Sequence, residues 1–565
     1  MLLSNLNLLA TAPGGVARLR ELILTLAVQG KLVPQDPNDE PASELLKKIR
    51  AEKNRLIAEG KIKRDKSLAE IAEKERPFGL PKGWEWVRLA TLLPFRIGKT
   101  PPSKDPQYWG DEGHAWVSIS DMTHFGAVLD TSRKITVKGA SVFGYEPLPV
   151  GTLIMSFKLT IGKISVLQVP AYHNEAIVSL MPLAGLQTDF LKYMLPTVSK
   201  TGASKDALMG ATLNTESLSN LLIALPPEAE QSRIVTRVEE LMRLCNALEA
   251  KGQLEATQHA QLVSILLGTL TQSETPEQLA ENWQRIATHF DLLLDRPQAV
   301  DALEQTILQL AVRGLLVPQD PQDEPASELL KKIRFEKDKL ILDGKIKRDK
   351  LLPRIAEDER PFASPWGWEW CHLNELVTIR GGKRVSNGYQ LSTVPTDFIY
   401  IRVSDMKDGS IDDSDLRYLD AEMQSTIRRY IITKDDIYIT IVGATIGKCG
   451  LVPEKFNGMN LTENAARLTP HILSNDFLYM VLSTEFCQNQ FLDKTKQVGV
   501  QKMALSRLAA TQIPLPPLSE QSRIVSRVAS LRRRCADLRR RLSESRDTQS
   551  QLAQALVENI YFSEV

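Results

Sequence analysis

The chain lacks the features that mark disulfide-rich, zinc-binding and membrane-spanning proteins. Only five of its 565 residues are cysteines, and they form no Cys-x-x-Cys pair and no Cys/His cluster. An odd number of scattered cysteines argues against a disulfide framework or a zinc site and predicts a reducing, cytoplasmic location. The sequence also lacks a run of about 18 apolar residues, so we expect no membrane-spanning helix.

Signatures of catalysis are missing as well. The segment Gly443–Cys449, GATIGKC, resembles a phosphate-binding loop, but its glycines are one residue too close and a cysteine replaces the magnesium-binding Ser or Thr. No GxGxxG opens a helix after a strand, and neither HExxH nor an Asn/Asp-Pro-Pro-Tyr/Phe methyltransferase signature occurs. A recognition or scaffold role is therefore the better prediction, with no catalytic residue, metal or cofactor in this chain.

The chain also lacks an excess of either charge. Its formal net charge is +1, so tight binding to nucleic acid through charge alone is not expected. Residues 90–225 carry 11 basic and 10 acidic side chains. Any DNA-binding face in this region must therefore be a local patch.

What the sequence does contain is one long stretch in two copies. Of the 35 residues in Leu32–Lys66, 29 are identical to their counterparts in Leu316–Lys350, at a constant offset of 284. A shorter repeat follows downstream of each copy, LPPEAEQSRIVTRV at Leu225–Val238 and LPPLSEQSRIVSRV at Leu515–Val528. We call the repeated segments the frames, and the two unlike segments between them the inserts. Such repeats indicate duplicated structural units.

The repeats predict the organisation of the chain. We expect an N-terminal helical frame at 1–86, a first insert at 87–224, a central region at 225–370, a second insert at 371–514 and a C-terminal long helix at 515–565. The central region holds a long helix at 228–270 and the second frame copy at 290–370. The predicted fold class is mixed α/β, with two globular α/β inserts separated by two long helices and a pseudo-twofold internal repeat.

The first frame is predicted to be mostly helical. Apolar residues at helical spacing over 19–27 predict a helix that Gly30 caps, and a second helix is expected over Ser43–Glu59. The prolines of Pro34–Pro41 predict an extended link between them. A basic run follows the second helix in each frame and is either a solvated helix exit or a contact with a partner. The partner-binding candidates are Lys61, Lys63, Arg64, Lys345, Lys347 and Arg348.

The inserts are predicted to consist largely of short strands. Candidate strands are Ala115–Ile119, Thr152–Phe157 and Ile164–Gln168 in the first insert, followed by a helix near Phe190–Tyr193, and Phe398–Val403, Asp436–Ile441 and Gly450–Val452 in the second. Each frame ends in two tryptophans at period two, Trp84 and Trp86 or Trp368 and Trp370, which suit the opening strand of an insert domain, and core packing is favoured for them over stacking on nucleic acid. The local echoes SISDM and RVSDM, and TIGK in both inserts, indicate one fold with two different surfaces.

Each predicted long helix carries an apolar heptad seam. The seam residues are Ile234, Val238, Leu241 and Leu248 in the first helix and Ile524, Val528, Leu531 and Leu538 in the second. We expect the two helices, each about 60 Å long, to pair through these seams as an antiparallel coiled coil. The arginines at 532–534 and 539–541 are interpreted as the solvated face of this coil rather than as a DNA contact.

Three features of the sequence together resemble the specificity subunit of type I restriction–modification enzymes. They are ILTLAVQGKLVPQD at Ile23–Asp36 with ILQLAVRGLLVPQD at Ile307–Asp320, the two LPP…EQSRIV blocks, and inserts that open with GKTPPSKDPQYW and GGKRVSNGYQ. The resemblance covers nearly the whole chain. It implies that the inserts are target recognition domains for a bipartite asymmetric DNA site, and that the long helices set the spacing between its two halves.

The resemblance also implies partners and cofactors. Two methyltransferase subunits would dock on the frames, translocase–nuclease subunits would join the assembly, and double-stranded DNA would be methylated at adenine N6. S-adenosylmethionine, ATP and Mg²⁺ would belong to the partner chains, which leaves this chain non-catalytic by itself.

Charge and loop position nominate DNA-binding residues in both inserts. They are Lys99, Lys104, Lys158, Lys163, Lys205, Arg380, Lys383, Arg384, Arg402, Lys448 and Lys502. Such side chains read guanine edges or hold phosphates, or are ordinary surface residues. The matched Lys163 and Lys448 are assigned a common phosphate contact, because a residue that reads sequence should differ between inserts for different half-sites.

Two other interpretations stay open at this point. A non-catalytic scaffold could pair two protein or glycan ligands without binding DNA, and an enzyme could carry an unrecognised site in its inserts. A gel shift with the co-encoded methyltransferase separates the first from DNA recognition, and a labelled methyl donor tests the second.

Overall fold

The structure is a computed structural model that describes residues 8–64, 68–158, 160–183, 185–202, 215–492 and 502–562. By its internal contacts the chain divides into two compact units. Unit 1 comprises Met1–Leu254 and Arg546–Val565, and unit 2 comprises Glu255–Ser545. Each unit holds one frame copy and one insert. No helix among the described residues is long and apolar enough to cross a membrane.

The frame of unit 1 begins with the two expected helices, α2 (Gly15–Val28) and α3 (Ala42–Ala58). The apolar face of α2 is buried, as the helical spacing over 19–27 predicts. Gly30 follows α2 with a φ of 71° and donates its N–H to the carbonyl of Ala27 at 3.3 Å. This backbone conformation favours glycine. A Cβ at this position would also come within 2.5 Å of Pro81, so the chain passes close here.

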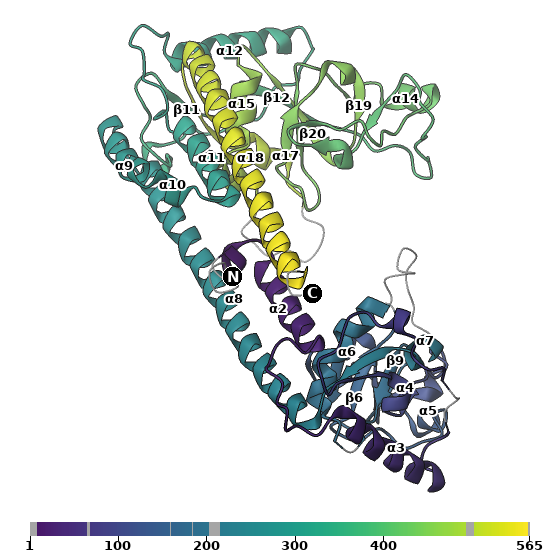
Figure 1. Ribbon diagram of the computed structural model, residues 1–565. Coiled ribbons are helices and arrows are strands. Elements are labelled where there is room, and N and C mark those ends of the chain that lie inside the picture. Colours follow the sequence, from purple (N-terminus) through teal and green to yellow (C-terminus); the bar gives the residue numbers. More distant parts are fainter. Residues whose placement is uncertain are drawn as a thin grey trace. The chain divides into compact units, whose positions relative to one another are not determined.

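The first and last strands of the insert of unit 1 pair with each other. Strand β1 (Glu85–Arg88) pairs antiparallel with β10 (Leu222–Leu225). Between them lie a five-stranded sheet of order β2-β9-β6-β7-β4 and a three-stranded sheet of order β5-β3-β8. Their bounds are β2 (Phe95–Ile97), β3 (Trp109–Val117), β4 (Gly126–Val128), β5 (Arg133–Ile135), β6 (Leu153–Ser156), β7 (Ile164–Leu167), β8 (Ala171–His173) and β9 (Ile177–Leu180). Helix α6 (Thr188–Gly202) shares a core with the larger sheet. Figure 1 shows this helix in the insert with the sheet strands β6 and β9.

Unit 2 repeats this plan. Its frame helices are α11 (Pro297–Val312) and α12 (Ala326–Leu342), and β11 (Glu369–His372) pairs antiparallel with β21 (Gln512–Leu515). The larger sheets have the orders β12-β20-β17-β18 and β13-β19-β16. Their bounds are β12 (Val377–Gly381), β13 (Tyr400–Ile401), β16 (Ile431–Ile432), β17 (Ile437–Thr440), β18 (Cys449–Leu451), β19 (Met459–Leu461) and β20 (Ala465–Pro470). The expected mixed α/β fold and internal repeat are confirmed.

The strand registers show that the two inserts share one fold. Phe95 faces Leu180 in unit 1, as Ile379 faces Leu468 in unit 2. The parallel pairs β3–β8 and β13–β19 agree in the same way, because Trp116 faces Tyr172 and Tyr400 faces Asn460. Equivalent residues are therefore 284 apart at the start of the inserts and 288 apart near their last strands. A candidate strand or helix predicted from sequence lies within or overlaps one of these elements in every case.

The Leu-Pro-Pro turns launch the two long helices as expected, α8 (Glu228–Thr271) and α18 (Leu518–Phe562). Their seams are buried in the cores of the two units. The seam of α8, with Ile234 and Val238 at most 1% exposed, lies in the core of unit 1 together with α2. The seam of α18 lies in the core of unit 2 together with α11. The two seams thus lie in different cores, each together with a frame helix, and the expected antiparallel coiled coil of the two long helices stays a prediction.

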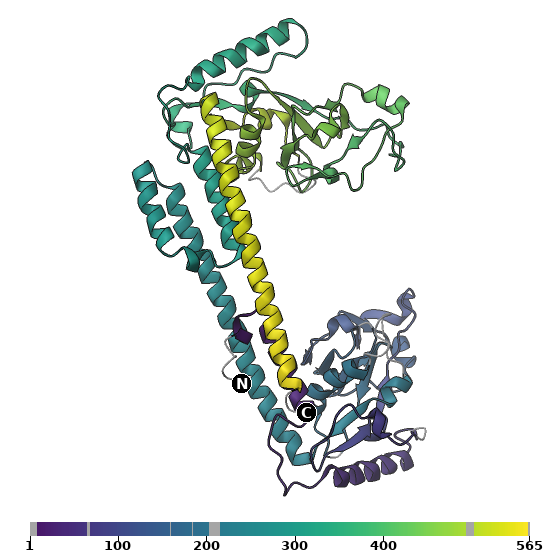
Figure 2. The same cartoon turned by 45° about the horizontal axis from the view of Figure 1, so that its top comes forward.

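The far ends of the long helices complete these three-helix cores. In unit 1, Ala553 of α18 is fully buried, and Arg18 of α2 donates to the hydroxyl of Ser550 at 2.9 Å. In unit 2, Val263 and Leu267 of α8 are buried in the same core as α11. Each unit therefore packs the start of one long helix, the end of the other and a frame helix (Figure 2).

Candidate functional site

A buried carboxylate joins the two repeated motifs in unit 1. Glu230, in the first turn of α8, accepts hydrogen bonds from Trp84 Nε1 at 2.9 Å and from Gln35 Nε2 at 3.2 Å. Gln35 also donates to the carbonyl of Gly30 at 2.6 Å. Burial raises the pKa of Glu230 above its ordinary value, although these hydrogen bonds act in the opposite direction. The carboxylate thus links the VPQD stretch, the first tryptophan at the end of the frame and the EQSR stretch.

Unit 2 contains the same carboxylate anchor. Glu520, in the first turn of α18, accepts hydrogen bonds from Trp368 Nε1 at 3.0 Å and Gln319 Nε2 at 3.2 Å. Gln319 donates to the carbonyl of Gly314 at 2.7 Å. Burial again raises the pKa of the carboxyl. Trp84 and Trp368 are 6% and 5% exposed, in agreement with the core packing that is predicted for them.

An ion pair next to each anchor fixes the same junction. Arg233 of α8 forms a two-pronged contact with Asp39, and Arg523 of α18 forms the same contact with Asp323. The arginine holds the pKa of Asp323 below its ordinary value. These internal contacts explain the near-identity of the VPQD and EQSR motifs. Sequence inspection found both motifs but missed that they meet, although their joint duplication was a usable signal.

The basic runs at the end of each frame copy remain on the surface. All six predicted partner-binding residues are exposed: Lys61, Lys63, Arg64, Lys345, Lys347 and Arg348. The first residue of each run forms an ion pair with a carboxylate just before it, Lys61 with Glu59 at 2.8 Å and Lys345 with Asp343 at 3.2 Å. The remaining four have no ion pair with any described residue, so four charges stay available in these runs.

In the first insert, the backbone that follows β2 passes very close to the end of β8, and we call this close approach a crossing. Gly98 lies so close to the end of β8 that a Cβ on it would come within 2.0 Å of the carbonyl oxygen of His173. The next residue, Lys99, donates its main-chain N–H to that oxygen at 3.0 Å. Its own carbonyl accepts a hydrogen bond from Trp116 Nε1 at 3.0 Å. The backbone of Lys99 is thereby fixed from two sides.

The second insert builds the same crossing after β12. A Cβ on Gly382 would come within 2.1 Å of the carbonyl oxygen of Thr462. Lys383 donates its main-chain N–H to the carbonyl of Leu461 at 2.9 Å, and its own carbonyl accepts a hydrogen bond from the Tyr400 hydroxyl at 2.9 Å. Tryptophan in one insert and tyrosine in the other thus perform the same task at equivalent positions.

The residue that follows this crossing differs between the inserts, whereas the residue that accepts its hydrogen bond is a glutamate in both. The hydroxyl of Thr100 donates to the carboxylate of Glu175. At the equivalent place Arg384 Nε donates to Glu463 Oε1 at 2.6 Å. Burial pushes the pKa of Glu463 upward, but hydrogen bonds led by that from Arg384 bring it below its ordinary value. A shared glutamate therefore holds two unlike side chains.

The other candidates of the first insert are dispersed. Lys104 is exposed on the loop after the crossing. Lys158 Nζ lies 5.5 Å from the ring centre of Phe157, and Lys163 Nζ donates to the carbonyl of Ile119 at 2.9 Å. The side chain of Lys99 likewise donates to the carbonyl of Val142 at 2.8 Å. Lys205 lies outside the described residues.

The candidates of the second insert are more constrained. Arg402 forms a two-pronged pair with Asp405, with Nε–Oδ2 at 3.1 Å and Nη2–Oδ1 at 2.6 Å. Arg380 Nη2 donates to the frame carbonyl of Lys345 at 2.6 Å. Lys383 Nζ lies 5.9 Å from the ring centre of Tyr430. Lys448 is half-buried and Lys502 is exposed.

The first insert also holds a group of stacked cations that sequence inspection missed. The Arg133 guanidinium lies 3.5 Å from the ring centre of Trp109. Lys138 Nζ lies 4.9 Å from the ring centre of Tyr108. Such contacts hold a cation over an aromatic face. The only sequence signal was the density of aromatic residues in this segment, which does not show which cations they face.

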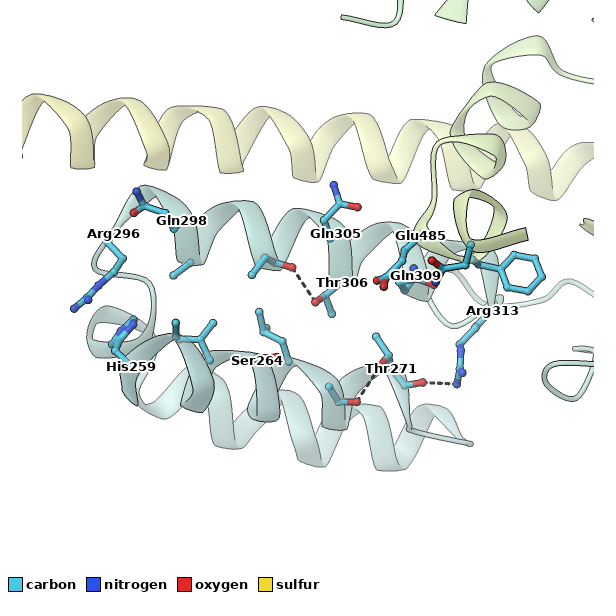
Figure 3. Close-up of a pocket in the computed structure, with 18 residues that line it drawn as sticks. His259, Ser264, Thr271, Arg296, Gln298, Gln305, Thr306, Gln309, Arg313 and Glu485 are labelled. Atoms are coloured by element: carbon cyan, nitrogen blue, oxygen red, sulfur yellow. Dashed lines mark hydrogen bonds between the residues drawn. The ribbon is translucent and has the colours of Figure 1, made fainter. Parts of the chain in front are cut away.

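A groove between the end of α8 and α11 gathers none of the described candidates (Figure 3). It has a volume of about 530 Å³ and is lined by residues of α8, of α11 and its flanking residues, and of α16 (Glu485–Phe491), with His259 and Arg313 among them. Burial lowers the pKa of Arg313, which donates to the carbonyl of Thr271. Within the described part of the chain, no group of three or more His, Cys, Asp or Glu residues is placed to hold a metal ion.

Comparisons with known proteins bear on this arrangement. The family model described as "Type I restriction modification DNA specificity domain" matches residues 81–258 and 365–545. The type I restriction enzyme EcoAI specificity subunit of Escherichia coli is 38% identical over 96% of this chain and 93% of its own length. The EcoEI specificity subunit of Escherichia coli is 34% identical over the same shares. A crystal structure of the HsdS subunit from Thermoanaerobacter tengcongensis aligns with 86% of this chain and 98% of its own, at 18% identity and a TM-score of 0.35. The chain belongs to the family of type I restriction enzyme specificity subunits.

Proposed function

We propose that this specificity subunit reads a bipartite asymmetric DNA site, with residues 87–224 reading one half-site and residues 371–514 the other. The observation that carries the proposal is the pair of like crossings after β2 and β12, which present Thr100 in one insert and Arg384 in the other. A common scaffold with unlike exposed side chains suits two different half-sites. Base edges are read by side chains in the grooves, whereas phosphate contacts fix position.

The chain acts as the recognition part of a larger enzyme in the cytoplasm. Two methyltransferase subunits dock on its frames, translocase–nuclease subunits join them, and adenine N6 is methylated. S-adenosylmethionine, ATP and Mg²⁺ bind to those partners. The family membership and the duplicated frames support this assembly, because equal surfaces suit equal partners.

The candidate residues take different roles, according to the protein groups that surround each of them. Lys163 and Lys448 occupy matching TIGK turns and contact phosphates, because the same residue in both inserts carries no half-site information. The exposed Lys104 and Lys502 are further candidates for phosphate contacts. Arg402 mainly holds its own loop, since Asp405 occupies its guanidinium. The free basic residues Lys63, Arg64, Lys347 and Arg348 form the docking surface for the methyltransferase subunits.

A gel shift tests this proposal. The chain alone should bind DNA weakly and lose that binding as salt rises, because few phosphate contacts form. Addition of the co-encoded methyltransferase should give tight, sequence-specific binding, and labelled methyl donor should be transferred only by the complex. Tight specific binding by the purified chain, or no DNA binding by the complex, contradicts the proposal. The second result would favour a scaffold for two protein ligands.

A further inference from the structure

The equivalence of the two crossings is set by backbone pairing rather than by sequence likeness. Gly98 and Gly382 each donate their backbone N–H to an equivalent strand, to the carbonyl of Ile177 at 3.3 Å and to that of Ala465 at 2.9 Å. Ile177 and Ala465 are 288 residues apart, and so are Glu175 and Glu463. The two glutamates therefore occupy one structural position, and Thr100 and Arg384 occupy another.

Glu463 is itself fixed before it meets the arginine. Its Oε2 atom accepts a hydrogen bond from Thr462 Oγ1 at 3.2 Å and lies 3.3 Å from the Tyr400 hydroxyl, which shares its one proton with the nearer Lys383 carbonyl. Oε1 is left for Arg384 Nε at 2.6 Å. The glutamate can thus orient the guanidinium, and orientation before binding reduces the entropy that is lost on recognition.

The arginine keeps its outer edge open. The Arg384 side chain is 67% exposed, and within the described residues neither Nη1 nor Nη2 has a hydrogen-bond partner. A guanidinium held through Nε presents these two parallel donors outward, in the fork that matches O6 and N7 of guanine. Arg402 contrasts with it, because its side chain is 24% exposed and Asp405 takes both Nε and Nη2.

We propose that Arg384, oriented by Glu463, reads a guanine in the half-site of the second insert, and that Thr100 on Glu175 fills the same position toward the first half-site. The inference rests on the proposed function and adds the base and the atoms that read it. Lys383, which precedes Arg384, has its counterpart in Lys99. Thr100 and Arg384 occupy the same exposed position, and each is bound by the equivalent glutamate. The two inserts therefore differ in the side chain that this glutamate presents to solvent.

The test uses the full chain in complex with its methyltransferase, and a DNA library randomised in one half-site at a time. Wild type should give one bipartite motif with a guanine in the half-site of the second insert. Arg384→Thr and Arg384→Lys should both lose the preference for that guanine by about tenfold or more, while the first half-site stays unchanged. The lysine variant keeps the charge but not the fork. Glu463→Gln should lose part of the preference.

Thr100→Ala is the matched control, and any change it causes should be confined to the first half-site. A thermal midpoint close to wild type shows that each variant is folded. The inference is overturned if Arg384→Lys keeps the guanine preference, or if the variants lower methylation equally for every base, as loss of a phosphate contact would. If wild type itself yields no bipartite motif, the proposed function fails, and the inference fails with it.

Discussion

The two frames have the same buried contacts, but a partly exposed ion pair has its charges exchanged between them. In unit 1, Arg20 of α2 pairs with Glu249 of α8 at 2.7 Å. At the equivalent place in unit 2, Glu304 of α11 pairs with Arg539 of α18 at 2.9 Å. The positions match by offsets of 284 in the frame helix and 290 in the long helix. Because the signs are exchanged, each frame helix is matched to one long helix and would meet a like charge on the other.

The buried anchors show the opposite behaviour. Glu230 and Glu520 have the same partners at nearly the same distances. A buried polar group tolerates little change, because any lost partner leaves an unsatisfied donor. Exposed ion pairs tolerate reversal, because they contribute little and need only opposite signs. Duplication has therefore kept what the core requires and varied what distinguishes one half from the other.

The largest predicted effect comes from removing one anchor. Glu230→Ala should destabilise unit 1 by about 2 kcal/mol, because Trp84 Nε1 loses its buried acceptor. Glu520→Ala should do the same to unit 2 through Trp368. Hydrogen exchange should show faster opening of β1 and β10 in the first variant and of β11 and β21 in the second.

Glu230→Gln and Glu520→Gln serve as controls, because the amide oxygen can still accept the tryptophan hydrogen bond. Their effect should be smaller than that of alanine. Equal loss of protection in both units from either alanine variant would show that the anchors are not local to their halves.

A smaller effect is expected from the matched lysines. Lys163→Ala and Lys448→Ala should each weaken DNA binding by the complex to a similar extent for all sequences. Each should also reduce the slope of log affinity against log salt by about one. Titration at several salt concentrations measures this. A change in the recognised bases after either substitution would contradict the assignment of a phosphate contact.

The exposed ion pair should contribute less than about 1 kcal/mol. Glu249→Arg places a like charge against Arg20 and should lower the free energy of unfolding slightly. The double variant Arg20→Glu, Glu249→Arg should recover it and give unit 1 the polarity of unit 2. A double-mutant cycle in denaturant measures the coupling, and a coupling of zero would remove the pair as a matching device.

The free energy of unfolding should fall gradually with rising pH as the two buried glutamates ionise. Since burial raises the folded-state pKa of Glu230 and Glu520 above their unfolded values, their contribution is full below the unfolded pKa and is lost as pH rises through the folded pKa. Glu520→Gln should flatten the part of the thermal midpoint profile that lies above the ordinary glutamate pKa of about 4.3. A profile for this variant that follows wild type would show that the carboxyl is not responsible.

Much of the fold could be predicted because its signals are local. Helical spacing, Gly30 and the prolines define α2 and its exit, and the Leu-Pro-Pro turns mark the starts of α8 and α18. The partner of each seam could not be predicted, because a heptad stripe shows that an apolar face is buried but not by what.

In the candidate site too, the residue types could be predicted from sequence, but their contacts could not. Arg384 and Arg402 look alike in sequence, as basic residues in loops of the second insert. Only the structure separates them, because Asp405 occupies one guanidinium and Glu463 leaves the outer edge of the other open. Glu463 itself carried no sequence signal, since its role depends on a strand register that is set by residues far apart in the chain.

The central claim is that two unlike readers on like frames recognise one divided DNA site. Single-molecule sequencing of methylated adenines in the genome of the host tests it most directly. We predict one motif with two specified parts separated by a gap of constant length. A continuous motif, or the absence of any motif that depends on this chain, would contradict the account.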